Sequence, residues 1–345
     1  MRVGIVGLGA IGGTVAARLL ATRAPGEELE LAAGSEESAA LLRSRGLSVA
    51  EGEAGAGAAL SVGCGAQAKL PGGAPYDLIL LCVRSEATAG ALEAIVPLLA
   101  ADGAVVCLQN GLPEEPVAVR AGAGRTLGAV IGWSATQDQP GRYRLTGQGG
   151  FKLGAVVSPP PPSLPRAREL LARAFPTSMT KNLQGARWGK LALNCAISTL
   201  GAVSGLSFGE LARRGDARTL ALRCIAEVVA VARAKGVRLA PISGLRAGWL
   251  ADDGRRPSPL LRPLRHALFR LAARQRPGQR SGMLERLLAG RTSGQIDDLN
   301  GAVVAQAVSV GLEAPLNRAL LELVHAIERG EEKIGTAQLE RLAAR

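Results

Sequence analysis

The chain begins Met1-Arg-Val-Gly-Ile-Val-Gly-Leu-Gly-Ala-Ile-Gly12, and this stretch decides the fold. Its short apolar run, Val3 to Val6, passes into glycines spaced Gly7-x-Gly9-x-x-Gly12, and a helix-forming segment follows. We interpret the pattern as a strand, a glycine turn and a helix. In such a unit Gly7 permits the tight turn, Gly9 lets a pyrophosphate approach the backbone, and Gly12 lets the helix pack on its strand. Since the helix start also offers free N–H groups, the stretch predicts a dinucleotide site.

Length and composition limit the number of domains and the class of protein that can surround this unit. The 345 residues are 47% hydrophobic, which suits two folded domains. There is no run of eighteen apolar residues and no signal pattern, so we expect a cytoplasmic protein without a membrane segment. The five cysteines show no CxxC spacing, which indicates buried thiols in a reducing compartment. We expect no metal site.

The net charge of +12 could indicate a nucleic-acid partner. The basic residues are mostly arginine, however, and alanine, glycine and proline are also abundant, as a GC-rich coding sequence produces. One segment, residues 246–280, is rich in both arginine and proline. It is a nucleic-acid or phosphate contact, a basic amphipathic helix, or a solvated insertion between helices. Its few aromatic residues favour the insertion, and we expect no nucleic-acid partner.

The succession of apolar runs and helical patterns changes character near residue 182. The first part predicts an α/β fold with a Rossmann-type, doubly wound parallel sheet. Its expected strands lie at 3–6, 29–33, 60–62, 77–83, 104–108, 126–133, 143–146, 150–154 and 177–180, and its helices at 37–45, 88–100 and 166–174. Beyond it the periodicity is helical, with Asp216 expected to cap one helix and Pro315 to open another. We therefore expect a dinucleotide-binding domain at 1–182 and an all-helical domain for substrate binding and dimerisation at 183–345.

Two polar positions could carry chemistry beside a dinucleotide. The two histidines, His266 and His325, follow no sheet strand, so a lysine or a tyrosine is the better candidate proton donor. Lys190, Asn194 and Ser198 are spaced i, i+4, i+8 and would form a polar stripe on an otherwise apolar helix.

Asn110 follows a buried strand and would lie at the carboxyl edge of the sheet, where ligands of open α/β folds bind. The alternative at that position is an Asn110-Gly111 turn with left-handed geometry.

Together these features resemble the ketopantoate reductase (2-dehydropantoate 2-reductase) family over nearly the whole chain. The similar stretches are Gly7-Leu-Gly-Ala-Ile-Gly12, Leu108-Gln-Asn-Gly111, Tyr143-Arg-Leu-Thr-Gly147, Trp188-Gly-Lys-Leu-Ala-Leu-Asn194, the motif around Ile296-Asp-Asp-Leu-Asn-Gly301, and Gly311-Leu-Glu-Ala-Pro-Leu-Asn317. The resemblance implies reduction of ketopantoate, a small 2-oxo acid, to pantoate with NADPH, in the pathway to pantothenate and coenzyme A.

The resemblance also implies a role for each matched residue. Lys190 would be the general acid that protonates the developing alkoxide, while Asn110 would orient both Lys190 and the cofactor. Asn194 would bind the substrate, and Arg84 would contact a phosphate of the dinucleotide. The residues expected to contact the dinucleotide are Gly7, Leu8, Gly9, Ala10, Ile11, Gly12, Arg84 and Asn110.

The sequence departs from the family where the family contacts its substrate. Ser198 replaces an asparagine, Ser281-Gly282 replaces a serine pair, and Gln295 replaces a glutamate. We expect Asn194, Ser198, Ser281 and Gln295 to bind the substrate. The departures leave open a reductase of another keto acid or carbonyl and a non-catalytic dinucleotide-binding regulator. As a partner of the chain, we also consider a second copy in a homodimer.

The residues that would discriminate between NADPH and NADH also depart from the family. Residues 33–35 read Ala-Gly-Ser where the family has an arginine for the 2′-phosphate of NADPH. Glu36 and Glu37 follow closely, so NADH is not excluded.

Overall fold

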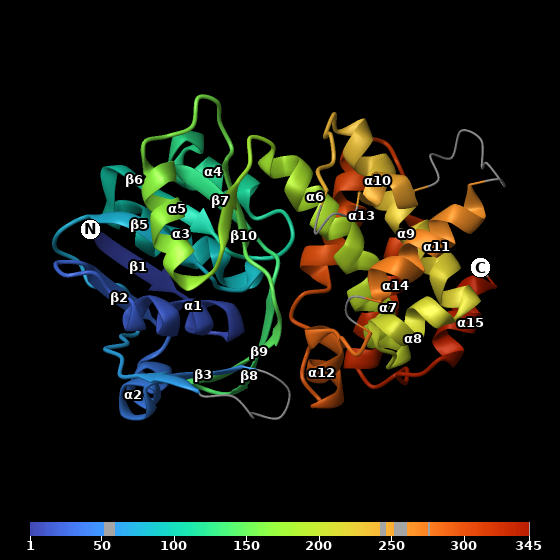
Figure 1. Cartoon of the computed structure of the whole chain (residues 1–345), viewed down its shortest axis with the longest axis horizontal. Coiled ribbons are helices and arrows are strands. Elements are labelled where there is room, and N and C mark those ends of the chain that lie inside the picture. The colour runs from blue at the N-terminus through green and yellow to red at the C-terminus, as the bar shows by residue number, and fades with distance from the viewer. Residues whose placement is uncertain (52–58, 242–245, 252–260, 275–276, 345) are drawn as a thin grey trace. The chain divides into compact units, whose positions relative to one another are not determined.

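The computed structural model describes residues 1–51, 59–241, 246–251, 261–274 and 277–344. The chain forms two compact units, Met1–Leu183 and Gln184–Arg345. In Figure 1 the first unit runs from blue to green and the second from yellow-green to red.

Unit 1 is built on a seven-stranded sheet with the order β11-β10-β7-β6-β5-β1-β2. The strands are β1 (Arg2–Val6), β2 (Glu28–Ala32), β5 (Tyr76–Leu81), β6 (Leu99–Cys107), β7 (Thr126–Ile131), β10 (Phe151–Ala155) and β11 (Thr177–Met179). All neighbouring pairs are parallel except β7 and β10, which run antiparallel. The expected α/β architecture is confirmed, but the sheet is mostly rather than wholly parallel, since β10 returns directly beside β7.

Helices cover both faces of this sheet, which explains why its central strands are apolar runs. On β5, Leu78 and Leu80 face a core that includes α1 (Ala10–Ala21) and α5 (Ser163–Ala174). The alternate residues, Ile79 and Leu81, face a second core with α3 (Thr88–Ile95) and α4 (Glu114–Ala121). A strand buried on both faces carries no polar alternation.

Four of the strands form a separate small sheet with the order β4-β3-β9-β8. They are β4 (Leu60–Val62), β3 (Leu47–Glu51), β9 (Arg142–Gly147) and β8 (Ser134–Gln139). The sequence places 60–62 and 143–146 in the parallel sheet, which is wrong. Helix α1 is apolar nearly all round, so it packs on the main sheet with one side and on the small sheet with the other.

The predicted helix at 88–100 is too long. Helix α3 ends at Ile95, a 3₁₀ turn (Val96–Leu98) follows, and β6 begins at Leu99. Pro97 ends the helix, because proline lacks the N–H that the helix needs and restricts the residue before it.

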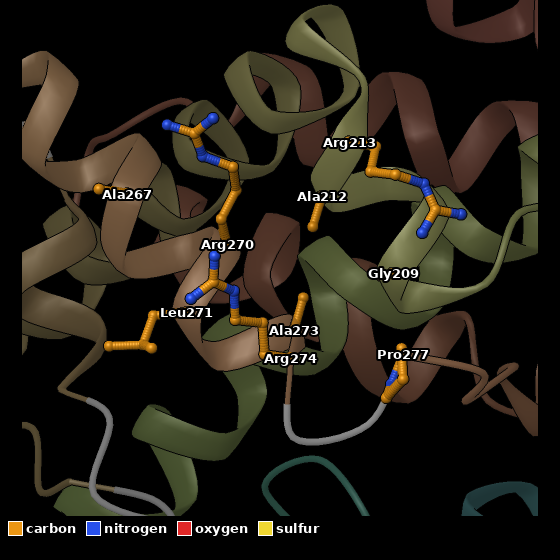
Figure 2. Close-up of a pocket in the computed structure, with 9 residues that line it drawn as sticks. All are labelled: Gly209, Ala212, Arg213, Ala267, Arg270, Leu271, Ala273, Arg274 and Pro277. Atoms are coloured by element: carbon orange, nitrogen blue, oxygen red, sulfur yellow. The ribbon is translucent and has the colours of Figure 1, made fainter.

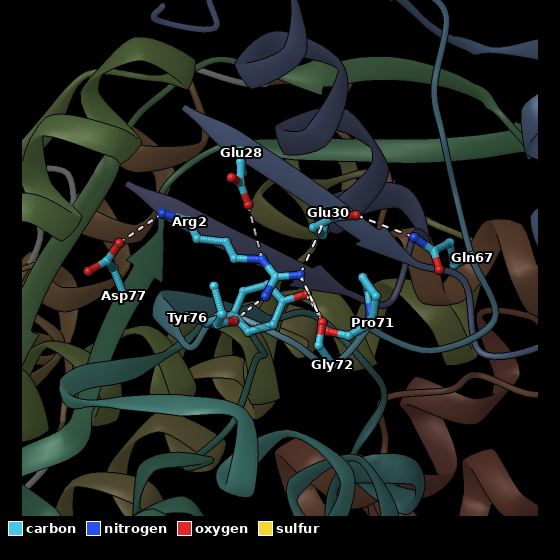
Figure 3. Close-up of polar contacts among 9 residues, drawn as sticks. Arg2, Glu28, Glu30, Gln67, Pro71, Gly72, Tyr76 and Asp77 are labelled. Carbon is cyan, nitrogen blue, oxygen red and sulfur yellow. Dashed lines mark hydrogen bonds and ion pairs between the residues drawn. The ribbon is translucent and has the colours of Figure 1, made fainter. Parts of the chain in front are cut away.

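Arg2 joins the amino ends of β1, β2 and β5, the edge opposite the one where ligands of such sheets bind (Figure 3). Its guanidinium pairs with Glu28 at 3.3 Å and lies 4.3 Å from the centre of the Tyr76 ring. Its backbone N–H donates to Asp77 at 2.8 Å. Arg2 therefore has a structural role that its position beside the glycine motif does not reveal.

The described residues of unit 2 form helices and no strands. The helices are α6 (Leu183–Leu193, beginning at the last residue of unit 1), α7 (Thr199–Ser204), α8 (Phe208–Arg213), α9 (Gly215–Ala234), α10 (Ala247–Leu250), α11 (Arg262–Ala273), α12 (Gly282–Leu288), α13 (Ala302–Ser309), α14 (Pro315–Glu328) and α15 (Ala337–Ala343). Two π-helical turns, η5 (Asn194–Ser198) and η6 (Asp297–Gly301), stand between them. Pro315 opens α14 as predicted.

The predicted cap of α9 is wrong. Arg214 occupies the N-cap position and Asp216 lies in the first turn, where its carboxylate accepts from the Ala217 N–H at 2.8 Å. The Arg214 guanidinium also donates to Asp216 at 2.7 Å. The carboxylate still stabilises the start of the helix, but from inside it.

The arginine- and proline-rich segment is more than a solvated insertion. Its described part contributes α10 and α11, and Phe269 of α11 is 1% exposed. That ring meets Phe208 of α8 edge-on, with 5.5 Å between ring centres. Residues 255–259 of the segment, which read Arg-Arg-Pro-Ser-Pro, lie outside the described residues. No helix among the described residues is both long and apolar enough to cross a membrane.

Candidate functional site

The glycine turn has the geometry that phosphate binding requires. Gly7 has a φ of +93°, and a Cβ on Gly12 would overlap the Gly7 carbonyl oxygen. A Cβ on Gly9, by contrast, would meet nothing within 4 Å. The first turn of α1 carries no acidic residue and no side-chain cap, so its N–H groups remain available to an anion. The turn therefore fits a dinucleotide pyrophosphate beside Gly9.

Tyr143 supports this turn, a role that no motif in the sequence indicates. Its hydroxyl donates to the Leu8 carbonyl at 2.8 Å, and its ring occupies the space that a Cβ on Gly13 would need. The residue is 2% exposed, and burial raises the pKa of its hydroxyl. In the sequence, Tyr143 stands in an alternating strand, which indicates only a core residue. Its hydrogen bond to Leu8 cannot be inferred from that pattern, because the two residues are 135 positions apart.

The predicted dinucleotide contacts of unit 1 all follow strands of the main sheet. The glycine turn follows β1, Arg84 comes shortly after β5, and Asn110 comes shortly after β6. Because β1 and β5 pair in parallel and β1 also pairs with β2, the strand order reverses here, as at other ligand sites of this fold class.

Arg84 and Asn110 differ in how firmly they are held. The Arg84 side chain is 52% exposed and lies 3.7 Å from Glu86. Asn110 is partly buried, and Gly111 after it has a φ of +75°, the left-handed turn geometry considered as the alternative. The neighbouring Gln109 amide donates to the Val83 carbonyl at 3.0 Å and to the Thr88 hydroxyl at 2.7 Å. That bridge fixes the loops after β5 and β6 to each other.

The side chains of the loop after β2 are those that would contact the ribose of a bound dinucleotide. Gly34 has a φ of +89°, and the Ser35 hydroxyl caps α2 (Glu36–Arg45) by accepting from the Ser38 N–H at 3.2 Å. Two carboxylates, Glu36 and Glu37, lie in the first turn of α2. Glu36 pairs with Arg43.

In unit 2 the predicted polar stripe lies on one partly exposed face. Lys190 is on α6, while Asn194 and Ser198 are on the π-helical turn η5. The partly buried positions between 190 and 198 are Lys190, Leu193, Asn194, Ile197 and Ser198, and the others are buried. A step of four residues rotates by more than one full turn in an α-helix but by less than one full turn in the wider π-helix. The π turn therefore keeps Ser198 aligned with Lys190, although the sequence suggests an uninterrupted α-helix.

Burial is the main cause that lowers the pKa of Lys190 to about 7, and the positive charge of Arg187 is the second cause. Arg187 lies one turn before Lys190 and is 2% exposed. An ammonium group whose pKa is close to the working pH is suited to proton transfer, because it can both hold and release the proton.

A buried amide network holds the π turn, and this too was missed. The Thr199 hydroxyl donates to Asn300 Oδ1 at 2.7 Å, and Asn300 Nδ2 donates to the Cys195 carbonyl at 3.4 Å. Asn300 Nδ2 also donates to Asn317 Oδ1 at 2.9 Å, and Asn317 Nδ2 donates to Glu227 at 2.7 Å. Asn300 and Asn317 are both 0% exposed. A side chain that bonds to a helix carbonyl is a recognised cause of such irregular turns.

The two remaining predicted substrate contacts lie elsewhere in unit 2. Ser281 is the N-cap of α12, where its hydroxyl accepts from the Leu284 N–H at 3.1 Å. Gln295 is partly buried and stands two residues before η6. Helix α12 packs against η5, which brings Ser281's helix to the π turn.

Comparison with known proteins identifies the family. Residues 3–158 match the family described as ketopantoate reductase PanE/ApbA, and residues 182–328 match its C-terminal part. The chain belongs to the ketopantoate reductase family. It is 28% identical over 329 residues to the 2-dehydropantoate 2-reductase of Pyrococcus horikoshii, covering 95% of this chain and 98% of that one.

Solved structures of similar fold span nearly the whole chain. The ketopantoate reductase of Ralstonia eutropha JMP134 is 28% identical with a TM-score of 0.75, covering 96% of this ketopantoate reductase family member and 99% of that chain. A D-mandelate dehydrogenase bound to NADH and anilino(oxo)acetate has a TM-score of 0.79 at 20% identity, covering 96% of this chain and 99% of that one. At 20% identity, the likeness to the D-mandelate dehydrogenase shows a shared fold alone.

Proposed function

We propose that this family member reduces a small 2-oxo acid to the 2-hydroxy acid with a nicotinamide dinucleotide, and that ketopantoate is its leading substrate. The observation that carries the proposal is the arrangement around Lys190. Its ammonium, with a pKa lowered to about 7, shares one helix face with two hydrogen-bonding side chains, Asn194 and Ser198.

The residues of unit 1 fit the dinucleotide that this reaction needs. The open space at Gly9 and the uncapped start of α1 suit a pyrophosphate, and Arg84 adds a positive charge at the same edge of the sheet. When bound, the reduced nicotinamide supplies the hydride that reduces the ketone carbon.

Lys190 supplies the proton in the proposed reaction. As the ketone carbon gains hydride, charge develops on the carbonyl oxygen, and Lys190 Nζ donates a proton to it. The ammonium stabilises that charge before transferring the proton, which is worth most in a site with little water. Asn110 orients Lys190 and the cofactor in this proposal. Substrate, hydride and proton together give the neutral hydroxyl of the product.

The substrate contacts favour a broader specificity than ketopantoate alone. We propose that Asn194, Ser198, Ser281 and Gln295 hydrogen-bond the substrate. Gln295 is neutral, so it offers both a donor and an acceptor where a glutamate offers only acceptors. A related fold binds anilino(oxo)acetate, which has a 2-oxo acid skeleton. An aryl 2-oxo acid is therefore the second candidate substrate.

For the cofactor we propose NADPH with weak discrimination against NADH. The family resemblance supports NADPH, while Glu36 and Glu37 in the first turn of α2 oppose a 2′-phosphate. Because Glu36 forms an ion pair with Arg43, its carboxylate repels a 2′-phosphate less strongly.

The decisive experiment measures NADPH and NADH oxidation with ketopantoate and with a panel of aliphatic and aryl 2-oxo acids. We expect turnover with at least one of them, and Lys190→Ala should lower kcat by about 10²–10⁴. Dinucleotide binding without turnover on any substrate would favour the non-catalytic regulator instead.

A further inference from the structure

Helices α8 and α11 of unit 2 border a groove of about 640 Å³ that the proposed reaction does not use (Figure 2). Its apolar lining includes Ala212, Ala267 and Leu271, and three arginines also line it. Small-molecule sites typically enclose about 300–1,000 Å³ and combine an apolar surface with a few polar groups. The groove has both properties.

The three arginines reach the groove from both helices. Figure 2 shows Arg270 on α11 and Arg274 directly after the last residue of that helix, while Arg213 extends from α8 toward the other side of the view. Within the described ranges, no ion pair engages any of them. The carboxylates closest in sequence are already held, since Glu210 accepts from the Ser207 hydroxyl at 2.7 Å and Asp216 accepts from Arg214 at the same distance.

A second set of basic groups adjoins the residues that line the groove. Arg218 Nε donates to His266 Nδ1 at 3.2 Å, and Arg218 Nη1 donates to the Ala212 carbonyl at 2.7 Å. Burial lowers the pKa of His266, and Arg218, Arg262 and Arg270 lower it further. Burial likewise lowers the pKa of Arg218, with Arg270 as the next cause. The basic groups here repel one another, so a bound anion would relieve that repulsion.

We propose that the groove between α8 and α11 binds a small, phosphate-bearing organic anion with an apolar part. Guanidinium groups match phosphate oxygens through paired hydrogen bonds, and Arg270 and Arg274 supply two of them on the α11 side of the groove. The apolar lining favours a ligand with a hydrocarbon portion over inorganic phosphate. A soluble phosphate ester and an anionic lipid share this chemistry, and the bounded volume favours the soluble ester. The proposal does not depend on the reductase activity.

Calorimetric titration with phenyl phosphate and with inorganic phosphate, both with saturating NADPH present, tests the site. We expect phenyl phosphate to bind about tenfold more tightly than inorganic phosphate, because its ring contacts the apolar lining. The double variant Arg270→Gln/Arg274→Gln should weaken phenyl phosphate binding by about tenfold or more. Leu271→Ser should bring the affinities for the two probes to within about threefold of each other.

The matched control is Arg223→Gln, which removes an exposed arginine of α9 that does not line the groove. It should leave both affinities unchanged. Arg270, Leu271 and Arg274 are all exposed, so the groove variants should keep the circular dichroism and Tm of the parent protein.

Four results would overturn the proposal. They are no binding of phenyl phosphate to the parent protein with or without NADPH, an equal loss of affinity in Arg223→Gln, binding of phenyl phosphate only when NADPH is left out, and co-flotation with phosphatidylglycerol vesicles that the double variant abolishes. The third would assign the probe to the dinucleotide site, and the fourth would assign the groove to a lipid surface.

Discussion

The glycine turn before α1 and the π-helical turn after α6 both display polar groups, but different forces fix them. The glycine turn is fixed by missing side chains: a Cβ on Gly12 would overlap the Gly7 carbonyl oxygen. The π turn is fixed by a side chain that is present, because Asn300 bonds both Thr199 and the Cys195 carbonyl. The first turn offers backbone N–H groups to an anion, and the second aligns Lys190 with Asn194 and Ser198.

This difference determines how each turn responds to substitution. Adding one methyl group at Gly12 disturbs backbone packing, whereas removing one amide from the π turn leaves buried polar groups unpaired. The two turns can therefore be broken separately, by opposite kinds of mutation.

The largest expected effect concerns the cation that the π turn aligns. A general acid must be protonated, and burial lowers the pKa of Lys190 to about 7. The value of kcat/KM for 2-oxo acid reduction should therefore be constant below pH 7 and fall about tenfold per pH unit above it. The pH profile of the purified enzyme checks this.

Lys190→Arg is the matched control for that profile, because an arginine stays protonated throughout the accessible range. It should lower kcat and remove the fall above pH 7. An unchanged pH profile in this variant would assign the titration to another group.

The contrast between the turns also explains what the sequence reveals. The roles of Gly7, Gly9 and Gly12 follow from spacing, since each acts on backbone within a few residues. The shared face of Lys190, Asn194 and Ser198 follows from helical periodicity in the same way. The supports of each turn act over long distances in sequence: Tyr143 bonds Leu8 across 135 residues, and Asn300 bonds Thr199 across 101. No local pattern in the sequence indicates such a pairing. The sequence therefore identifies Tyr143 and Asn300 only as parts of stretches that resemble the family, and not as supports of the two turns.

The second prediction breaks the glycine turn at two positions with opposite surroundings. Gly12→Ala should destabilise unit 1 by about 3 kcal/mol, because its Cβ overlaps backbone that has little room to move. Gly9→Ala meets open space, so it should leave Tm nearly unchanged but weaken dinucleotide binding by about tenfold, since its methyl group obstructs the pyrophosphate.

Thermal unfolding and a dinucleotide titration on both variants distinguish these effects. If Gly9→Ala bound NADPH and NADH as the parent does, the phosphates would lie elsewhere and the proposed cofactor site would be wrong.

The third prediction breaks the π turn. Asn300→Ala should cost about 2 kcal/mol in the free energy of unfolding, because Thr199 and Asn317 lose a buried partner. Activity of the folded variant should also fall, since Asn194 and Ser198 would lose their alignment with Lys190. Denaturant unfolding and steady-state kinetics measure the two effects.

Thr199→Val provides the comparison, because it removes one hydrogen bond of the network and keeps Asn300 bonded to Asn317. Its cost should be about 1 kcal/mol. Equal kinetics for Asn300→Ala and the parent enzyme would show that the network supports stability alone.

The smallest expected effect lies beside the glycine turn, in the loop that would meet the ribose of the dinucleotide. Ser35→Arg should raise the ratio of kcat/KM for NADPH to that for NADH by about tenfold, because a guanidinium can pair with the 2′-phosphate. The substitution also removes the cap of α2, so Ser35→Ala is the control that loses the cap without gaining the charge. A backbone at φ +89° makes Gly34 a poor site for the same test. If both variants shifted the ratio equally, the cap rather than the charge would govern cofactor choice, and the proposed position of the ribose would be wrong.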